Sequence, residues 1–191
     1  MEMPRVPGNW QGVVNRINDS TDEIKGYFDP VPELIECYPW EVSIGYMFTR
    51  VEQAHNHLLR GAAVKIHGVN NSTATRFVDR QHMTRKEFSR LYKNVVGDAI
   101  PKRSVKILSE AEKIRDRVVH GKRVAQKDQR TAIVYIVEYA EMINEKLLEK
   151  ANFFPFKADQ RGYAGRRTTL PDATSAWVMK GLGFGNQGQT E

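Results

Sequence analysis

The stretch IVYIVEYAEMINEKL, residues 133–147, indicates most clearly which kind of fold this chain of 191 residues adopts. Its apolar residues recur at alternating steps of three and four positions, which is the period of one face of an α-helix. The members of that face are Ile133, Ile136, Ala140, Ile143 and Leu147. We therefore expect a long amphipathic helix over about residues 125–151.

Two earlier segments show the same period. The first covers about residues 39–66, and its apolar stripe consists of Ile44, Met47, Val51, Ala54, Leu58 and Ala62. The second lies within residues 79–96, where Thr84 and Glu87 have the spacing of a capping box and Gly97 follows as an end signal. Both segments are expected to be helices with one face in a core.

A further helix is expected over about residues 103–119. Its core-facing residues are Ile107, Leu108, Ala111, Ile114 and Val118. Gly121 stands where a glycine commonly follows the end of a helix. Four amphipathic helices joined by short loops predict an all-α fold, an antiparallel helix bundle.

The bundle is expected to occupy residues 1–152, with its core at about 38–152. Residues 153–191 hold many glycines and arginines and predict an irregular extension, apart from a short turn at about 173–180. Trp177 in that turn is expected to anchor the extension to the bundle or to another subunit.

The segment before the bundle also predicts irregular structure. A short helical candidate lies near residues 13–24, and residues 27–32 predict an extended connector because Pro30 and Pro32 restrict the residues before them. Residues 68–73 predict a loop from their glycine, asparagine and serine content.

Composition limits the kind of protein further. Apolar residues make up 40% and charged residues 27%, which is typical of a globular chain. A formal charge of +6 favours polyanionic partners, with nucleic acid first. The apolar runs are too short for a membrane span, and the N-terminus lacks the apolar core of a signal peptide, so we expect a cytoplasmic protein. Cys37 is the only cysteine, which excludes an internal disulfide, and we expect it to be buried.

The segment between the last two expected helices carries the most reactive side chains. We call residues 115–123, which read RDRVVHGKR, the Arg–His corner. Arg115 is a permanent cation, and His120 exchanges protons near neutral pH. On an ideal helix they would lie about 140° apart, but a helix that ends at Gly121 lets His120 turn toward Arg115. Arg115 and His120 are therefore the candidate catalytic residues, and Asp116 is the candidate that orients them.

The Arg–His corner is also strongly positive. Arg117, Lys122 and Arg123 are expected to bind RNA phosphates. A second interpretation stays open, because an arginine and a histidine at a helix C-terminus also complement its dipole and bind its last carbonyl groups.

The corner resembles the motif of the HEPN (higher eukaryotes and prokaryotes nucleotide-binding) family. That motif is an arginine followed by Asn, Asp or His, with a histidine after four to six intervening residues. Arg115, Asp116 and His120 match it, and the corner lies at the expected junction of two bundle helices. The resemblance covers about residues 38–152.

The resemblance implies a metal-independent endoribonuclease with a composite site across a homodimer, acting as a toxin or defence effector. His120 would exchange protons with the ribose 2′-oxygen or the leaving oxygen, and Arg115 would hold the phosphate. No cofactor or metal is expected, and the partners would be RNA, a second copy of the chain and an antitoxin or regulatory protein. One toxin subgroup has a tyrosine at the position of Lys122, so the mode of neutralisation is open.

Two alternatives belong to other functional classes. Some HEPN-like proteins keep the fold without cleaving RNA, so a non-catalytic module that binds nucleotides or a partner protein is the second hypothesis. A DNA-binding regulator ranks last, because the loop at residues 97–101 does not suit a helix-turn-helix.

Several weaker signals favour ordinary structural roles. Gly183, Gly185 and Gly188 match a dinucleotide-binding pattern, but no strand is expected before them. His55 and His57 are two positions apart, which suits surface or interface histidines better than a metal site. Two groups of basic residues suggest RNA-binding stripes and are more typical of solvated surface. One consists of Arg76 and Arg80 with either Lys86 or Arg90, and the other, in the extension, of Arg161, Arg166 and Arg167.

Overall fold

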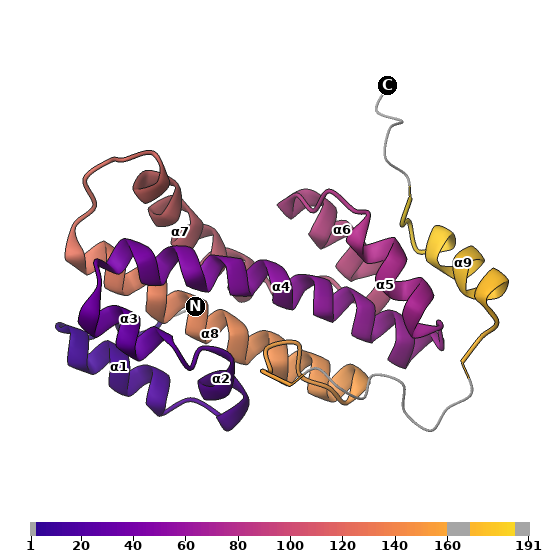
Figure 1. The fold of residues 1–191 in the computed structure, drawn as a ribbon, viewed down its shortest axis with the longest axis horizontal. Coiled ribbons are helices and arrows are strands. Elements are labelled where there is room, and N and C mark those ends of the chain that lie inside the picture. Colours follow the sequence, from indigo (N-terminus) through magenta and orange to yellow (C-terminus); the bar gives the residue numbers. More distant parts are fainter. Residues whose placement is uncertain (1–2, 160–168, 186–191) are drawn as a thin grey trace. The chain divides into compact units, whose positions relative to one another are not determined.

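The computed structural model describes residues 3–159 and 169–185, and every regular element in these ranges is a helix. The all-α prediction is therefore confirmed. Two helices are much longer than the others, α4 (Trp40–His67) with 28 residues and α8 (Gln126–Ala151) with 26 residues (Figure 1). Within the described ranges, no helix has both the length and the apolar composition needed to cross a bilayer.

The chain forms two compact units, and α4 and α8 contribute to both. Unit 1 comprises Met1–Gln53, Pro101–Glu145 and Phe156–Ala158, and unit 2 comprises Ala54–Ile100, Lys146–Pro155 and Asp159–Glu191. Each long helix runs from one unit into the other, and the boundary expected at residue 152 stays a prediction.

Unit 1 contains the Arg–His corner, residues 115–123. Its complete helices are α1 (Trp10–Asn18), α2 (Asp22–Tyr27), α3 (Val31–Cys37) and α7 (Lys102–Val119). α1 packs against α2 and α3. Its core includes the expected stripe residues of α4 and α8, all at most 2% exposed: Ile44, Met47, Val51, Ile133, Ile136, Ala140 and Ile143.

An aromatic cluster in unit 1 explains why the chain returns to it after α8. The ring of Phe156 meets those of Tyr27 and Tyr139 edge-on, at centroid distances of 5.4 and 5.9 Å. Asn144 fixes the Phe156 backbone from both sides, since its side chain accepts from the N–H and donates to the carbonyl, each at 2.9 Å.

The extended connector expected at residues 27–32 is wrong. Tyr27 ends α2, and α3 begins at Val31 with Pro32 in its first turn. A proline is tolerated there because the first N–H groups of a helix have no partner within the helix.

Unit 2 contains α5 (Asn71–Asp79), α6 (Arg85–Val96) and α9 (Asp172–Gly181), with parts of α4 and α8. The predicted cap of α6 is confirmed, since the Thr84 hydroxyl accepts from the Glu87 N–H at 3.2 Å. Its glycine end is also confirmed, because Gly97 has φ of 85°. The loop expected at residues 68–73 ends early, because the Asn70 side chain caps α5 by accepting from two N–H groups.

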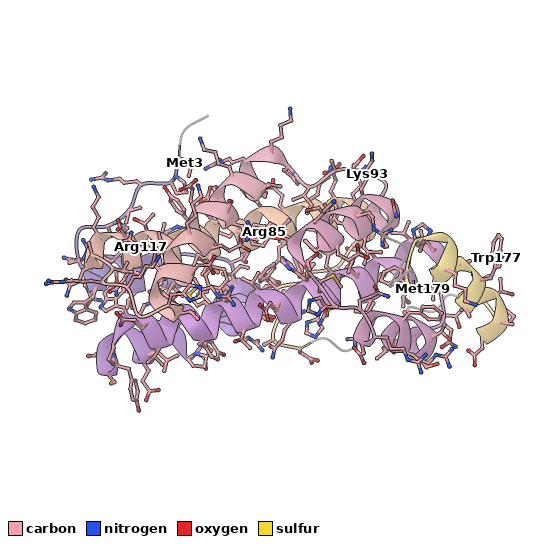
Figure 2. The ribbon with its side chains drawn as sticks, turned by 90° about the horizontal axis from the view of Figure 1, so that it is seen from above. Met3, Arg85, Lys93, Arg117, Trp177 and Met179 are labelled. Atoms are coloured by element: carbon pink, nitrogen blue, oxygen red, sulfur yellow. The ribbon has the colours of Figure 1, made fainter. Side chains whose placement is uncertain are left out.

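The extension is only partly irregular. The expected turn is the helix α9, which packs against α5, and the Ser175 hydroxyl accepts from the Asn70 N–H at 2.9 Å. Met179 lies on the buried side of α9 and is 0% exposed, whereas Trp177 points away into solvent and is 76% exposed (Figure 2). Trp177 therefore does not anchor the extension within this chain.

Two smaller expectations about burial are also corrected. Cys37 is exposed because it lies in the last turn of the short helix α3. Ile114 and Val118, expected in the core, are only half-buried, because α7 is buried mainly at Ser104, Ile107, Leu108 and Ala111.

Candidate active site: the Arg–His corner

The Arg–His corner is shaped by the way α7 ends. Gly121 has φ of 65°, its N–H donates to the Val118 carbonyl, and the Lys122 N–H donates to the Arg117 carbonyl, both at 2.9 Å. This pair of bonds is a Schellman motif, which needs a left-handed residue directly after the helix cap. The prediction that Gly121 ends the helix is confirmed, and His120 is the cap residue.

His120 is exposed at this end of α7. Its backbone N–H donates to the Asp116 carbonyl at 3.1 Å, so its position continues the helix by one residue. Within the described ranges its imidazole makes no hydrogen bond or ion pair. Lys122 and Arg123 follow it and are exposed as well. The imidazole is therefore open to a ligand, and two exposed cations follow it closely in the sequence.

Arg115 is held differently, by contacts with α4. Its guanidinium carbon lies 5.4 Å from the centre of the Phe48 ring, a distance suited to a cation–π contact. Its amino groups lie 4.0 Å from a Glu52 carboxylate oxygen and 3.5 Å from an Asp116 carboxylate oxygen. The side chain is 37% exposed, so part of its fork remains accessible to an anion.

The structure joins the side chains of Arg115 and Asp116, and neither of these side chains makes a hydrogen bond or ion pair with the His120 imidazole. Because α7 remains helical to Val119 and the bend follows His120, the two side chains leave the helix about 140° apart. The expectation that Gly121 turns His120 toward Arg115 is thus wrong for a single chain. The glycine acts one residue too late to redirect the histidine.

Arg117 already has partners within the corner. It donates to the Arg123 carbonyl at 3.1 Å and to an Asp128 carboxylate oxygen at 3.4 Å, which holds the loop between α7 and α8. Its binding of RNA stays a prediction, as does that of Lys122 and Arg123.

Sequence reasoning missed the two residues of α4 that position Arg115. Phe48 and Glu52 are four positions apart, so they share a face of α4, and each directly follows a member of the predicted stripe, Met47 or Val51. That spacing was a usable signal. The sequence did not show which later helix would pack against Phe48 and Glu52.

Other candidate residues have structural surroundings. His55 is not a surface histidine, because its ring stacks on Phe88 at 3.7 Å between centroids. Burial, and then the charge of Arg85, lower the pKa of His55 to about 3. No group of three or more metal-ligating side chains is found among the described residues.

The basic stripe expected from Arg76 to Arg90 does not form one helical face. α5 ends at Asp79, and Arg90 lies on α6, where it binds Glu87 and the Gly183 carbonyl. Gly188 and the arginines at 161, 166 and 167 lie outside the described residues.

No family model, curated protein or solved structure matches this chain. The chemistry of the corner is therefore inferred from its own residues. The corner offers an exposed imidazole, a guanidinium fixed by a neighbouring helix and two exposed cations, a combination suited to a phosphodiester.

Proposed function

We propose that this chain is a metal-independent endoribonuclease of the HEPN type and that Arg115 and His120 carry the reaction. The observation that carries the proposal is the Schellman end of α7. It leaves the His120 imidazole exposed beside Lys122 and Arg123, while α4 holds Arg115 through Phe48. An exposed, positively charged helix end suits an RNA phosphate.

The chemistry follows from these groups. His120 takes the proton of a ribose 2′-hydroxyl, the 2′-oxygen bonds to the adjacent phosphorus, and the bond from phosphorus to the 5′-oxygen breaks. Arg115 stabilises the charge that builds on the phosphate oxygens. The leaving 5′-oxygen takes up a proton, which gives a 2′,3′-cyclic phosphate and a 5′-hydroxyl. DNA lacks the nucleophile and is not cut.

A second copy of the chain completes the proposed site. One histidine does not serve easily as both base and acid, and Arg115 and His120 of one chain do not touch. The outer face of α7 offers a surface for pairing, since Val119 is 67% exposed and Ile114 and Val118 are half-buried. We infer a homodimer that places both Arg–His corners around one RNA strand, in a cytoplasmic toxin or defence effector restrained by an antitoxin or regulatory protein.

The test is cleavage of total RNA and of a defined single strand by purified protein in EDTA. Wild type should cut both, and Arg115→Ala and His120→Ala should each lose the activity. Arg76→Ala and His82→Ala are matched controls, since both residues are exposed and lie outside the corner. Equal results for wild type and all variants, or a strict need for magnesium, would contradict the proposal.

The second candidate is a non-catalytic helical module that binds nucleotides or a partner protein. The favouring observation is that Arg115 already has three partners, Phe48, Glu52 and Asp116, as a structural arginine would. In that case Arg115→Ala lowers stability and no variant changes RNA. Expression in cells separates the two candidates, because an active nuclease is tolerated only after Arg115 or His120 is replaced.

A further inference from the structure

Unit 1 contains a pocket that shares no residue with the Arg–His corner. Its volume is about 380 Å³, within the range of sites for small ligands. Its lining includes Trp10, Glu36, Trp40, Gln126 and Arg130. Every one of these residues belongs to unit 1.

The pocket lies where three helices begin. Trp10, Trp40 and Gln126 are the first residues of α1, α4 and α8, and all three line it. The N-terminal end of a helix carries a partial positive charge. In α1 the Asn9 side chain already accepts from the Gly12 N–H at 2.8 Å, so the attraction for an anion comes from the partial charge of the helix ends. Three such ends around one pocket favour an anion.

Arg130 adds a full positive charge to the same pocket. Its Nε donates to the Pro7 carbonyl at 3.1 Å, which fixes the side chain. Among the described residues its two terminal amino groups have no hydrogen-bond partner. These groups form the fork that binds phosphate oxygens in pairs.

The remaining lining residues suit a flat aromatic ligand with polar edges. Trp10 and Trp40 both line the pocket, and neither residue is fully buried. Indole rings stack on nucleobases without regard to sequence. The Glu36 carboxylate accepts hydrogen bonds, and the Gln126 amide both donates and accepts.

We propose that this pocket binds one nucleotide unit, with its base against Trp10 and Trp40 and its phosphate at Arg130 and the helix starts. Glu36 accepts from the exocyclic amino group of the base, so adenine and cytosine are favoured over uracil, which has no amino group. The unit comes either from a free nucleotide or from single-stranded RNA. The binding does not require RNA cleavage by the Arg–His corner.

Intrinsic fluorescence tests the pocket directly. The chain has three tryptophans, and two of them line it. A Trp177→Phe protein removes the third, so its emission reports on Trp10 and Trp40. The probes are AMP, UMP, ribose 5-phosphate and a 2′-O-methyl oligoadenylate, which lacks the hydroxyl needed for cleavage.

AMP should give a saturable change in emission. UMP and ribose 5-phosphate should bind with at least about tenfold lower affinity, because UMP lacks the amino group for Glu36 and ribose 5-phosphate lacks the base. An oligoadenylate that binds more tightly than AMP identifies RNA as the source, and the reverse identifies a free nucleotide. If neither AMP nor the oligoadenylate gives a saturable change, the proposal is overturned.

Variants assign the contacts. Arg130→Gln should lower the affinity for AMP about tenfold or more, because it removes the paired contact with the phosphate. Lys127→Gln is the matched control, because Lys127 is exposed on the same helix and does not line the pocket. Equal weakening by both variants would overturn the proposal by showing non-specific attraction.

Two further variants keep the test independent of folding and of the nuclease. Glu36 is exposed, so Glu36→Gln preserves the fold and should narrow the preference for AMP over UMP. An unchanged preference contradicts the assigned contact. His120→Ala should bind AMP as wild type does, even though it is expected to lose cleavage. Loss of AMP binding in His120→Ala would contradict a separate pocket.

Discussion

The first and last turns of α7 carry similar residues in different surroundings. At the start of the helix, Arg103 donates to a Glu138 carboxylate oxygen of α8 at 2.6 Å, and Ser104 is 0% exposed. At the end, His120 is exposed and Val119 is 67% exposed. One end of α7 is fixed to the core of unit 1, and the other presents its side chains to solvent.

The charges at the first turn belong to an ion-pair cluster, which consists of Arg16, Arg103, Glu138 and Glu141. Arg16 donates to Glu141 at 2.5 Å and to Glu138 at 3.2 Å, which connects α1 to α8. Each cation there has an acid as partner. His120, Lys122 and Arg123 have no such acid among the described residues. The difference indicates that the cluster stabilises unit 1, whereas the corner's exposed charges are available to a ligand.

The largest expected effect separates the two ends by activity. His120→Ala should lower the rate of RNA cleavage by about 100-fold or more, because a positioned general acid or base contributes at least that much. Its free energy of unfolding should change by less than about 0.5 kcal/mol, as for most exposed residues. Single-turnover cleavage and urea unfolding measure the two quantities. A variant that is unstable but active would reverse the assignment.

The second effect separates the two ends by stability. Glu138→Ala should lower the free energy of unfolding by about 2–3 kcal/mol, because it leaves the half-buried Arg16 and Arg103 without this partner. The control is Glu110→Ala on α7, because the Glu110–Lys113 pair is exposed and such pairs contribute at most about 1 kcal/mol. Similar unfolding free energies for both variants would show that the cluster is no more important than a surface ion pair.

The third effect tests the backbone that places His120. Gly121→Ala should destabilise by about 1–2 kcal/mol, because alanine is strained at φ of 65°. Gly45→Ala should instead stabilise by about 0.5–1 kcal/mol, since Gly45 lies inside α4 with no atom within 4 Å of an added Cβ. Thermal unfolding compares them, and a change of the same sign in both would contradict the Schellman end of α7.

The smallest effect contrasts the half-buried His55 with the exposed histidine of the corner. The pKa of His55 is about 3 in the folded protein and near 6.5 when unfolded, so the unfolded chain binds the proton more readily. The stability that His55 contributes is complete above pH 6.5 and is lost as pH falls from 6.5 toward 3. We expect a loss of about 1 kcal/mol between pH 7 and pH 5, because the half-exposed ring keeps part of its hydration.

The measurement is urea unfolding at several pH values. His55→Leu should flatten the pH dependence, and Asn56→Ala, the next residue of α4, should retain it. If the slope of wild type persists in His55→Leu, the proton uptake on unfolding belongs to other groups.

The elements that sequence predicted well are those whose signal is local. The stripes of α4 and α8 are buried as expected, because a three-and-four period over several turns leaves one apolar face. The cap at Thr84 and the end at Gly121 depend only on neighbouring residues, so they were also predictable.

The failures involve contacts between segments far apart in the chain. Trp177 was expected to anchor the extension, but the buried apolar residue of α9 is Met179, and Trp177 is exposed. The pocket at Arg130 combines the starts of α1, α4 and α8, which no single window of sequence shows. The contact of Arg115 with Phe48 of α4 is likewise a contact between segments far apart in the chain.

The direct test of the central claim is cleavage of a defined single-stranded RNA in EDTA by wild type and His120→Ala, with His82→Ala as control. Wild type and the control should produce fragments that end in a 2′,3′-cyclic phosphate, and His120→Ala should produce none. Cleavage that persists in His120→Ala, or its absence in a folded, dimeric wild type, would contradict the account.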